Sequence, residues 1–253
     1  MLRFYYVIVA SFFRMLYYVW VADYYAKHPE KYDELTCYRH AQKMMNLLRR
    51  RAFVRTNTYG AENLPQEGGY IMYANHQGKY DSLGVMIYHD KPCSVLIEYK
   101  NSYVFSTKQV IDLTRGVRID QQKPRQQLRA LRRLGEEVRQ GRRFLVFPEG
   151  GYKDNKNTLQ EFHDGCFYSA YLAKCPIVPV VLVDSYKAMN TSKIGRVTTE
   201  VHYLPPIPYE DYKDAPRAET CSRVKSLIQA KLDEILAARA EKEKSKRKKK
   251  SKK

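Results

Sequence analysis

The sequence predicts an α/β fold in which a mostly parallel sheet is covered by helices and preceded by an N-terminal segment of two helices. Short apolar runs of strand length, such as Tyr70 to Ala74 and Ile177 to Asp184, alternate with stretches of helical periodicity, such as Pro124 to Gln140. This alternation is typical of parallel strands whose connecting helices cover the sheet. The chain has 253 residues, of which 44% are hydrophobic, so it is long enough for one large domain with attachments.

Residues 2–22 are the most apolar part of the chain and contain only Arg3 and Arg14 as charged residues. A helix that crosses a bilayer needs about 20 apolar residues, and the two arginines lie about three helical turns apart on one face. We therefore expect a helix that lies in the membrane interface while its arginines extend to lipid phosphates. A single spanning helix stays an alternative. A signal peptide is disfavoured because no small-x-small cleavage site follows.

A second, basic amphipathic helix is predicted from about Tyr32 to Phe53. Its apolar residues repeat at helical spacing, and its basic and polar residues share the opposite face. Beside a very apolar helix, this pattern favours a membrane-associating segment over residues 1–53. An ordinary surface helix with a solvated basic face is the alternative.

Residues 54–240 are predicted to form the α/β domain. The expected strands are Val54 to Tyr59, Tyr70 to Ala74, Val95 to Ile97, Val117 to Asp120, Phe144 to Phe147, Ile177 to Asp184 and Thr198 to Tyr203, the last with the alternation of an edge strand. The expected helices are Ser82 to Tyr88, Pro124 to Gln140, His163 to Lys174 and Ala215 to Ala240.

The charge of the chain points to a polyanionic partner. Net charge is +18, and residues 242–253 alone hold nine Lys or Arg and one Glu. A run of like charges cannot pack, so residues 241–253 are predicted to be a disordered basic tail. We expect an anionic membrane surface as the partner and no nucleic acid, because the chain contains no recognised nucleic-acid motif and such a role leaves the apolar N-terminus unexplained.

The five cysteines form no C-x-x-C pair and no metal-ligand cluster with the six histidines. Scattered thiols of this kind indicate a reducing compartment. We therefore expect membrane attachment at the cytoplasmic face, interfacial or single-pass, and no metal site.

The candidate chemistry lies in two loops that each follow a predicted strand. His76 comes just after the strand Tyr70 to Ala74, five residues before Asp81, and Glu149 follows the strand Phe144 to Phe147. In open α/β sheets, ligands bind at the carboxyl ends of strands. A neutral imidazole can take a proton near pH 7, and a carboxylate can hold it in the required tautomer.

Three blocks together resemble the conserved segments of the glycerolipid acyltransferases, in the 1-acylglycerol-3-phosphate acyltransferase branch. They are Asn75-His76 with Asp81, Phe147-Pro148-Glu149-Gly150, and Pro176-Ile177-Val178-Pro179-Val180. A fourth segment, Phe162-His163-Asp164-Gly165, resembles the family's Phe-x-x-Gly. The order and spacing agree over about residues 54–208.

The resemblance implies acyl transfer from acyl-CoA or an acyl carrier protein to the free hydroxyl of a lysophospholipid. The expected acceptor is 1-acylglycerol-3-phosphate and the expected product phosphatidic acid. His76 would be the general base and Asp81 would orient it. Asn75, Glu149, Gly150 and Pro179 would contact substrate. No cofactor is implied beyond the acyl donor.

Two positions depart from the family pattern. Tyr152 and Gln121 stand where the family has the arginines of its Glu-Gly-Thr-Arg and Ile-Asp-Arg segments. Arg118 and Lys153 lie nearby in the sequence, so we expect them to bind the acceptor phosphate in their place. The alternatives are a different lysolipid acceptor, or a non-catalytic lipid-binding relative.

Overall fold

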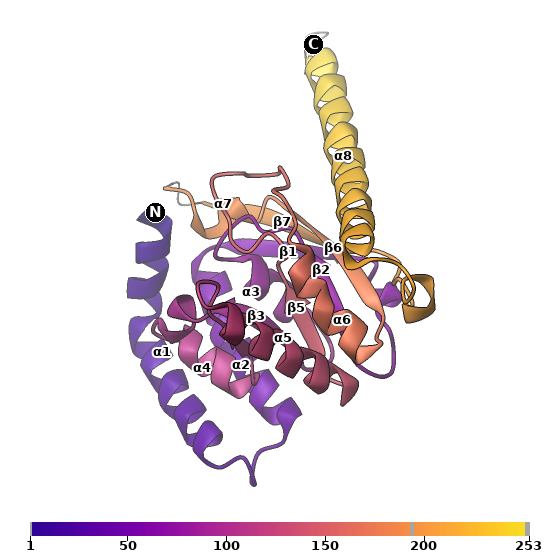
Figure 1. Ribbon diagram of the computed structural model, residues 1–253. Helices are drawn as coiled ribbons and strands as arrows, with labels where there is room; N and C mark the ends of the chain where they lie inside the picture. Colours follow the sequence, from indigo (N-terminus) through magenta and orange to yellow (C-terminus); the bar gives the residue numbers. More distant parts are fainter. Residues whose placement is uncertain (1, 193–194, 251–253) are drawn as a thin grey trace.

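A seven-stranded sheet with helices on both faces forms the body of the protein (Figure 1). The computed structural model describes residues 2–192 and 195–250. The strands are β1 (Val54–Tyr59), β2 (Tyr70–Ala74), β3 (Cys93–Glu98), β4 (Val117–Ile119), β5 (Arg143–Val146), β6 (Ile177–Val183) and β7 (Val197–Tyr203). The α-helices are α1 (Leu2–Lys27), α2 (Glu34–Arg51), α3 (Asp81–Met86), α4 (Thr107–Leu113), α5 (Pro124–Arg139), α6 (Tyr168–Ala173), α7 (Tyr186–Met189) and α8 (Arg217–Lys250). The predicted fold class is confirmed.

The order of strands in the sheet is β1-β7-β6-β2-β5-β3-β4. Neighbouring strands among those described are parallel except for β6 and β7, which are antiparallel. The prediction that residues 198–203 form an edge strand is wrong, because β1 pairs with the outer side of β7. Their alternation arises because Thr199, Val201 and Tyr203 are buried while their neighbours are not.

Strand residues alternate between two cores, as the pleat of a sheet requires. On β2, Tyr70 and Met72 join the core beneath α1 to α4, whereas Ile71 and Tyr73 join the core beneath α5, α6 and α8. Because β2 is buried on both faces, it is apolar at every position rather than at every second one.

The two N-terminal helices pack against the sheet rather than standing apart from it. The N-cap residue Asp33 accepts a hydrogen bond from Thr36 N at 2.8 Å and starts α2. Met15 of α1 and Met44 of α2 share a core with Met72 of β2. Figure 1 shows α1 running along the outside of the body, beside α2 and α4.

Only one face of α1 is buried, and it carries Arg3, Val7, Ser11, Met15 and Ala22. Arg3 donates hydrogen bonds to the carbonyls of Ala52 and Gly195. The expected stripe of two lipid-facing arginines is therefore wrong for Arg3, while Arg14 is exposed. The opposite face exposes large apolar side chains, and among the described helices α1 is the one long and apolar enough to cross a membrane.

The last helix extends far beyond its predicted end. α8 continues to Lys250, so the prediction of disorder from residue 241 is wrong for residues 241–250, and residues 251–253 lie outside the described part. Residues 217–250 contain no Gly or Pro after the first turn, and they are rich in Ala, Glu, Lys and Arg, which are good helix formers. Figure 1 shows the end of α8 projecting from the body.

Smaller differences concern helix boundaries. The helix after the His76 loop begins at Asp81 and ends at Met86. The segment predicted as one helix over residues 163–174 consists of a short 3-10 helix, Asp164–Phe167, followed by α6. The separation of residues 1–53 and 54–240 into an attachment segment and a domain remains a prediction.

Candidate active site

The site lies where three neighbouring parallel strands end. β2 lies between β5 and β6, so the residues that follow these strands meet at one edge of the sheet. His76 follows β2, Glu149 follows β5 and Asp184 follows β6. The topology thus brings together loops that are more than 70 residues apart along the chain.

His76 and Asp81 form a hydrogen-bonded pair. The His76 Nδ1 to Asp81 Oδ2 distance is 2.6 Å, and the imidazole is 18% exposed while the carboxylate is fully buried. An ionised carboxylate only accepts hydrogen bonds, so His76 Nδ1 is the donor. The neutral ring then carries its lone pair on Nε2, which is the nitrogen able to take a proton from a substrate.

The loop between the two residues wraps around the Asp81 carboxylate. Asp81 Oδ2 also accepts hydrogen bonds from the backbone N–H groups of Gln77 at 2.5 Å and Gly78 at 2.9 Å. A Cβ atom at Gly78 would lie 2.8 to 2.9 Å from the side-chain atoms of Asn190. The absence of a Cβ atom at Gly78 thus lets the Asn190 side chain pack closely against the loop that holds Asp81.

Two aromatic rings fix the plane of the His76 imidazole. Phe147 stacks on it with ring centroids 4.1 Å apart, and Tyr152 meets it edge-on at 4.7 Å. Burial raises the pKa of the Tyr152 hydroxyl, with the nearby Asp81 charge acting in the same direction. Tyr152 is therefore a neutral phenol packed against the candidate base.

Glu149 holds the backbone of the His76 loop. Its Oε1 accepts from His76 N at 3.1 Å, and its Oε2 accepts from Gln160 Nε2 at 2.5 Å. The side chain is buried, and this burial raises the pKa of the Glu149 carboxyl although both hydrogen bonds oppose the shift. Its position favours a role in placing His76.

Asn75 and Gly150 lie beside the pair of His76 and Asp81, and both make hydrogen bonds within the protein. The Asn75 amide donates to Leu182 O at 3.0 Å and accepts from Leu182 N at 2.7 Å, so its side chain joins β2 to β6 and is not free for substrate. Gly150 has φ +69° and its carbonyl accepts from Gln121 Nε2 at 2.7 Å. Asn75 is fully buried, and its predicted contact with substrate stays a prediction.

The other predicted residues lie at different distances from His76. Arg118 lies on β4, three strands from β2, where it pairs with Asp112 at 2.6 Å and donates to Ser102 at 3.0 Å. Pro179 is buried within β6, opposite Tyr73 of β2. Lys153 is exposed in the loop directly after Tyr152, whose ring contacts His76. Arg118 is thus held away from His76 by its place in the sheet, and the phosphate-binding role of Lys153 stays a prediction.

A set of amides lines the loops in a way that the sequence did not indicate. They are Gln77, Gln121, Asn155, Asn157 and Gln160. Asn155 donates to His76 O at 3.0 Å, and Gln77 is buried and bonded to Ser185 and Leu182. In the sequence, the one feature that sets these amides apart is their place in loops after strands. This feature does not identify them as site residues, because Asn and Gln are common in loops of every kind.

No group of three or more His, Cys, Asp or Glu in the described part of the chain is arranged to hold a metal ion. The polar groups near His76 are amides and the two carboxylates of Asp81 and Glu149, both of which accept hydrogen bonds from His76.

The chain is similar to known proteins in sequence and in fold. A sequence model of the family described as Acyltransferase matches residues 55–183. The 1-acyl-sn-glycerol-3-phosphate acyltransferase alpha of Ovis aries is 29% identical over 164 residues, which are 63% of this chain and 56% of that protein. The 1-acyl-sn-glycerol-3-phosphate acyltransferase of Saccharomyces cerevisiae is 28% identical over 214 residues, which are 83% of this chain and 68% of that protein.

The fold is shared with a solved structure. The crystal structure of the 1-acyl-sn-glycerophosphate acyltransferase PlsC from Thermotoga maritima matches with a TM-score of 0.70 and 17% identity, covering 91% of this chain and 98% of that one. The matches to the mammalian alpha proteins span only 56% of those proteins.

Proposed function

The chain belongs to the acyltransferase family, and on this premise we propose that it transfers a fatty acyl group from a thioester to the free hydroxyl of a lysophospholipid. The proposed acceptor is 1-acylglycerol-3-phosphate, the product is phosphatidic acid, and the donor is acyl-CoA or an acyl carrier protein. The observation that carries the proposal is the bond between His76 Nδ1 and buried Asp81, which directs the lone pair of Nε2 outward. The names of the similar proteins support the acceptor.

In the proposed reaction His76 Nε2 removes the proton of the acceptor hydroxyl as its oxygen attacks the thioester carbonyl. Asp81 stabilises the imidazolium that forms. The tetrahedral intermediate then collapses, the C–S bond breaks, and the same proton passes from His76 to the leaving thiolate. General-base assistance of this kind contributes about 10²–10⁴-fold in rate.

Glu149 supports this step from the backbone. By accepting from His76 N it fixes the loop, while Phe147 and Tyr152 fix the ring. The N–H groups of His76, Gln77 and Gly78 are bonded to Glu149 or Asp81. These three N–H groups are therefore not free to donate hydrogen bonds to the negatively charged oxygen of the tetrahedral intermediate. The N–H of Gly150 is not free either, because it is bonded to Phe147 O. We expect no metal and no cofactor besides the acyl donor.

The proposed place of action is the cytoplasmic face of a membrane. The outer face of α1 exposes Val9, Phe13, Tyr17 and Trp20, each by 60% or more. Aromatic residues of this kind favour the membrane interface. Because the inner face of α1 is packed against the body, an orientation along the surface keeps these contacts, whereas a spanning helix would lose them. The basic residues of α8 add attraction to anionic lipids.

One observation favours a second acceptor class. Tyr152 and Gln121 stand in place of the two arginines, and no guanidinium contacts the described side chains of His76, Glu149 or Tyr152. A lysolipid with a neutral or zwitterionic headgroup is therefore the alternative acceptor. An assay that offers lysophosphatidate and a neutral lysolipid together with one labelled donor distinguishes the two.

The test of the proposed reaction is the His76→Ala variant, with His28→Ala as a matched control on the surface near the end of α1. We expect kcat to fall about 10²–10⁴-fold in His76→Ala, and Asp81→Asn to lower kcat as well. Vesicle binding and thermal unfolding should match the parent protein for His76→Ala.

Retained transfer in His76→Ala would refute the general-base role. Absence of turnover by the parent with every donor and lysolipid would favour a non-catalytic lipid-binding relative.

A further inference from the structure

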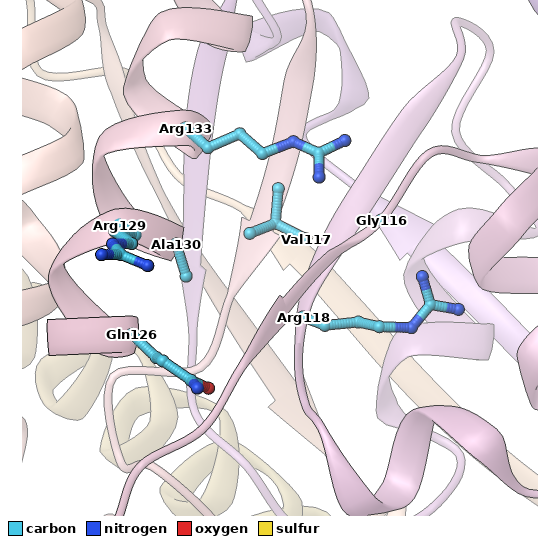
Figure 2. A pocket seen from close by; sticks show the side chains of 7 residues that line it. All are labelled: Gly116, Val117, Arg118, Gln126, Arg129, Ala130 and Arg133. Atoms are coloured by element: carbon cyan, nitrogen blue, oxygen red, sulfur yellow. The ribbon is translucent and has the colours of Figure 1, made fainter. Parts of the chain in front are cut away.

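A cavity of about 230 Å³ lies between α5 and the edge strand β4. Gln126, Arg129, Ala130 and Arg133 line it from α5, and residues 116–118 line it from the β4 side. Figure 2 shows Arg129 and Arg133 on the helix, with Val117 between the helix and Arg118. We call this the arginine pocket.

The cations on the helix side are available to a ligand. Arg129 and Arg133 are exposed and one turn apart on α5. Arg133 Nε lies 3.7 Å from Glu137 Oε1, which is a weak contact, and Arg129 has no ion-pair partner among the described residues. Guanidinium groups bind phosphate oxygens in a two-pronged geometry, so two of them beside a cavity are suited to a phosphate ester.

The edge strand adds a backbone donor. Ile119 O accepts from Tyr99 N on the β3 side, and the backbone groups of successive strand residues point to opposite edges. The N–H of Arg118 therefore faces the open edge of the sheet. The Arg118 side chain extends away from α5 in Figure 2, toward its partner Asp112. Arg118 thus contributes its backbone to the pocket more than its charge.

The location of the arginine pocket limits which phosphate can reach it. β4 is three strands from β2 in the sheet, and three inter-strand spacings amount to roughly 14 Å. In a lysophosphatidate, only two carbons and one oxygen separate the attacking hydroxyl oxygen from phosphorus. The acceptor phosphate therefore cannot occupy the arginine pocket while its hydroxyl is at His76.

The phosphates of a coenzyme A thioester meet this requirement. A long uncharged pantetheine arm separates them from the thioester, so they must bind at a distance from the reacting carbonyl. The loop after β4 leads from the pocket to the site, since Gln121 Nε2 contacts Gly150 O at 2.7 Å. We propose that the arginine pocket binds the phosphates of an acyl-CoA donor. The proposal rests on the proposed acyl transfer for the identity of the donor.

The size of the cavity agrees with binding one part of the donor. At about 230 Å³, it is smaller than the roughly 300–1,000 Å³ of pockets that enclose whole small molecules. It fits phosphate groups, with the nucleoside left outside against the protein surface.

The test is direct binding of free CoA, pantetheine and lysophosphatidate to the full chain by calorimetry. The variant is Arg129→Gln/Arg133→Gln, and the control is Arg132→Gln/Arg139→Gln, which removes the same charge from exposed positions of α5 outside the pocket. We expect the first pair to weaken CoA binding about tenfold or more, the control pair to change it little, and pantetheine to bind weakly to all three. Added salt should weaken CoA binding to the parent.

Each other result overturns the proposal. CoA affinity that is unchanged in Arg129→Gln/Arg133→Gln means that the arginines only protect the sheet edge. Equal loss in both double variants means general charge attraction without a site. Loss of lysophosphatidate binding alone assigns the pocket to the acceptor. A parent that does not bind CoA, yet acylates a lysolipid from an acyl carrier protein, refutes the CoA site and leaves the proposed function intact. Matching thermal unfolding of all variants shows that they are folded.

Discussion

Four neighbouring residues hold the His76 imidazole in one orientation and one tautomer. Asp81 fixes the tautomer, Phe147 and Tyr152 fix the plane, and Glu149 fixes the backbone. Each contact restricts a different degree of freedom of the imidazole. In the proposed reaction, a base held in this way needs little reorganisation when the acceptor hydroxyl arrives.

Tyr152 provides a prediction about the acceptor. Because Tyr152 lies against His76 at the position where the family has arginine, Tyr152→Arg should place a phosphate-binding fork beside the base. We expect KM for lysophosphatidate to fall about tenfold, with little change for a neutral lysolipid, in steady-state assays with one acyl donor. Tyr152→Gln, which also removes the ring, is the control. An equal effect of both substitutions would mean that loss of the ring, and not the added charge, is responsible.

His89 provides a prediction about stability at acidic pH. The imidazole is buried, with Nδ1 donating to Lys91 O at 2.6 Å and Nε2 accepting from Tyr70 Oη at 2.8 Å. Burial lowers the pKa of His89 from 6.5 to about 4. Between these values the unfolded chain binds the proton and the folded chain does not, so the free energy of unfolding falls as pH falls.

The loss in the free energy of unfolding grows as pH falls from about 6.5 and levels off below about pH 4 at roughly 3 kcal/mol, since each unit of pKa shift corresponds to about 1.4 kcal/mol. Urea unfolding of the parent protein and of His89→Gln between pH 7 and pH 4 measures it. The variant should be less stable at pH 7 and should lose less stability on acidification. Parallel acid slopes in the two proteins would contradict this role of His89.

At the scale of elements, α8 has two parts with different roles. Val224, Ile228 and Leu232 are buried against the sheet, and Arg239 then pairs with Asp184 at 2.9 Å and Glu200 at 2.7 Å. Beyond Arg239, residues 240–246 and 248 are exposed. The helix thus packs against the body as far as Arg239, and the good helix formers of its basic end support the helical conformation beyond that residue.

This division predicts different effects of two changes on stability. Arg239→Gln removes the cation that Asp184 and Glu200 share, although Lys187 and His202 remain beside them, and should lower the free energy of unfolding by about 2 kcal/mol. Truncation after Ala240 removes a segment whose described side chains, 241–246 and 248, are exposed, and it should change the free energy of unfolding by less than about 0.5 kcal/mol. Urea denaturation followed by circular dichroism measures both. A larger loss on truncation than in Arg239→Gln would show that the end of α8 contacts the body.

At the scale of the whole molecule, the sheet separates two differently built faces. α1 to α4 cover one face, and α1 presents exposed aromatic residues outward, whereas α5, α6 and α8 cover the other. The candidate catalytic loops lie at the strand ends between these layers. Under the proposed function, a lipid acceptor enters from the side of α1, and the arginine pocket lies beside α5 on the other face.

The exposed face of α1 gives a prediction about membrane binding. Phe13 and Trp20 are 86% and 67% exposed, and burying such side chains in a membrane contributes about 1.5–3 kcal/mol each. Phe13→Glu/Trp20→Glu should therefore reduce cosedimentation with anionic vesicles about a hundredfold or more in partition coefficient. Leu227→Glu, at an exposed apolar position on α8 across the sheet, is the control. An equal loss in the control would refute the assignment of this face.

The pattern of the chain determined the layers, most element boundaries and the residues of the dyad. Apolar runs such as β2 are recognisable locally because burial on both faces requires apolar side chains throughout, and the His76 to Asp81 spacing is short enough for one loop. The family resemblance then connected Glu149 with His76, and the structure brings them together.

Only the tertiary structure decided which segments of the chain lie next to one another. The neighbours of β7, the burial of Arg3 and the distance of Arg118 from His76 depend on strand order, and strand order depends on contacts between segments far apart in the chain. The amide lining of the site was hidden for the same reason. Local sequence reports which face of a strand or helix is buried, and the partner that covers that face is chosen by the packing of the whole molecule.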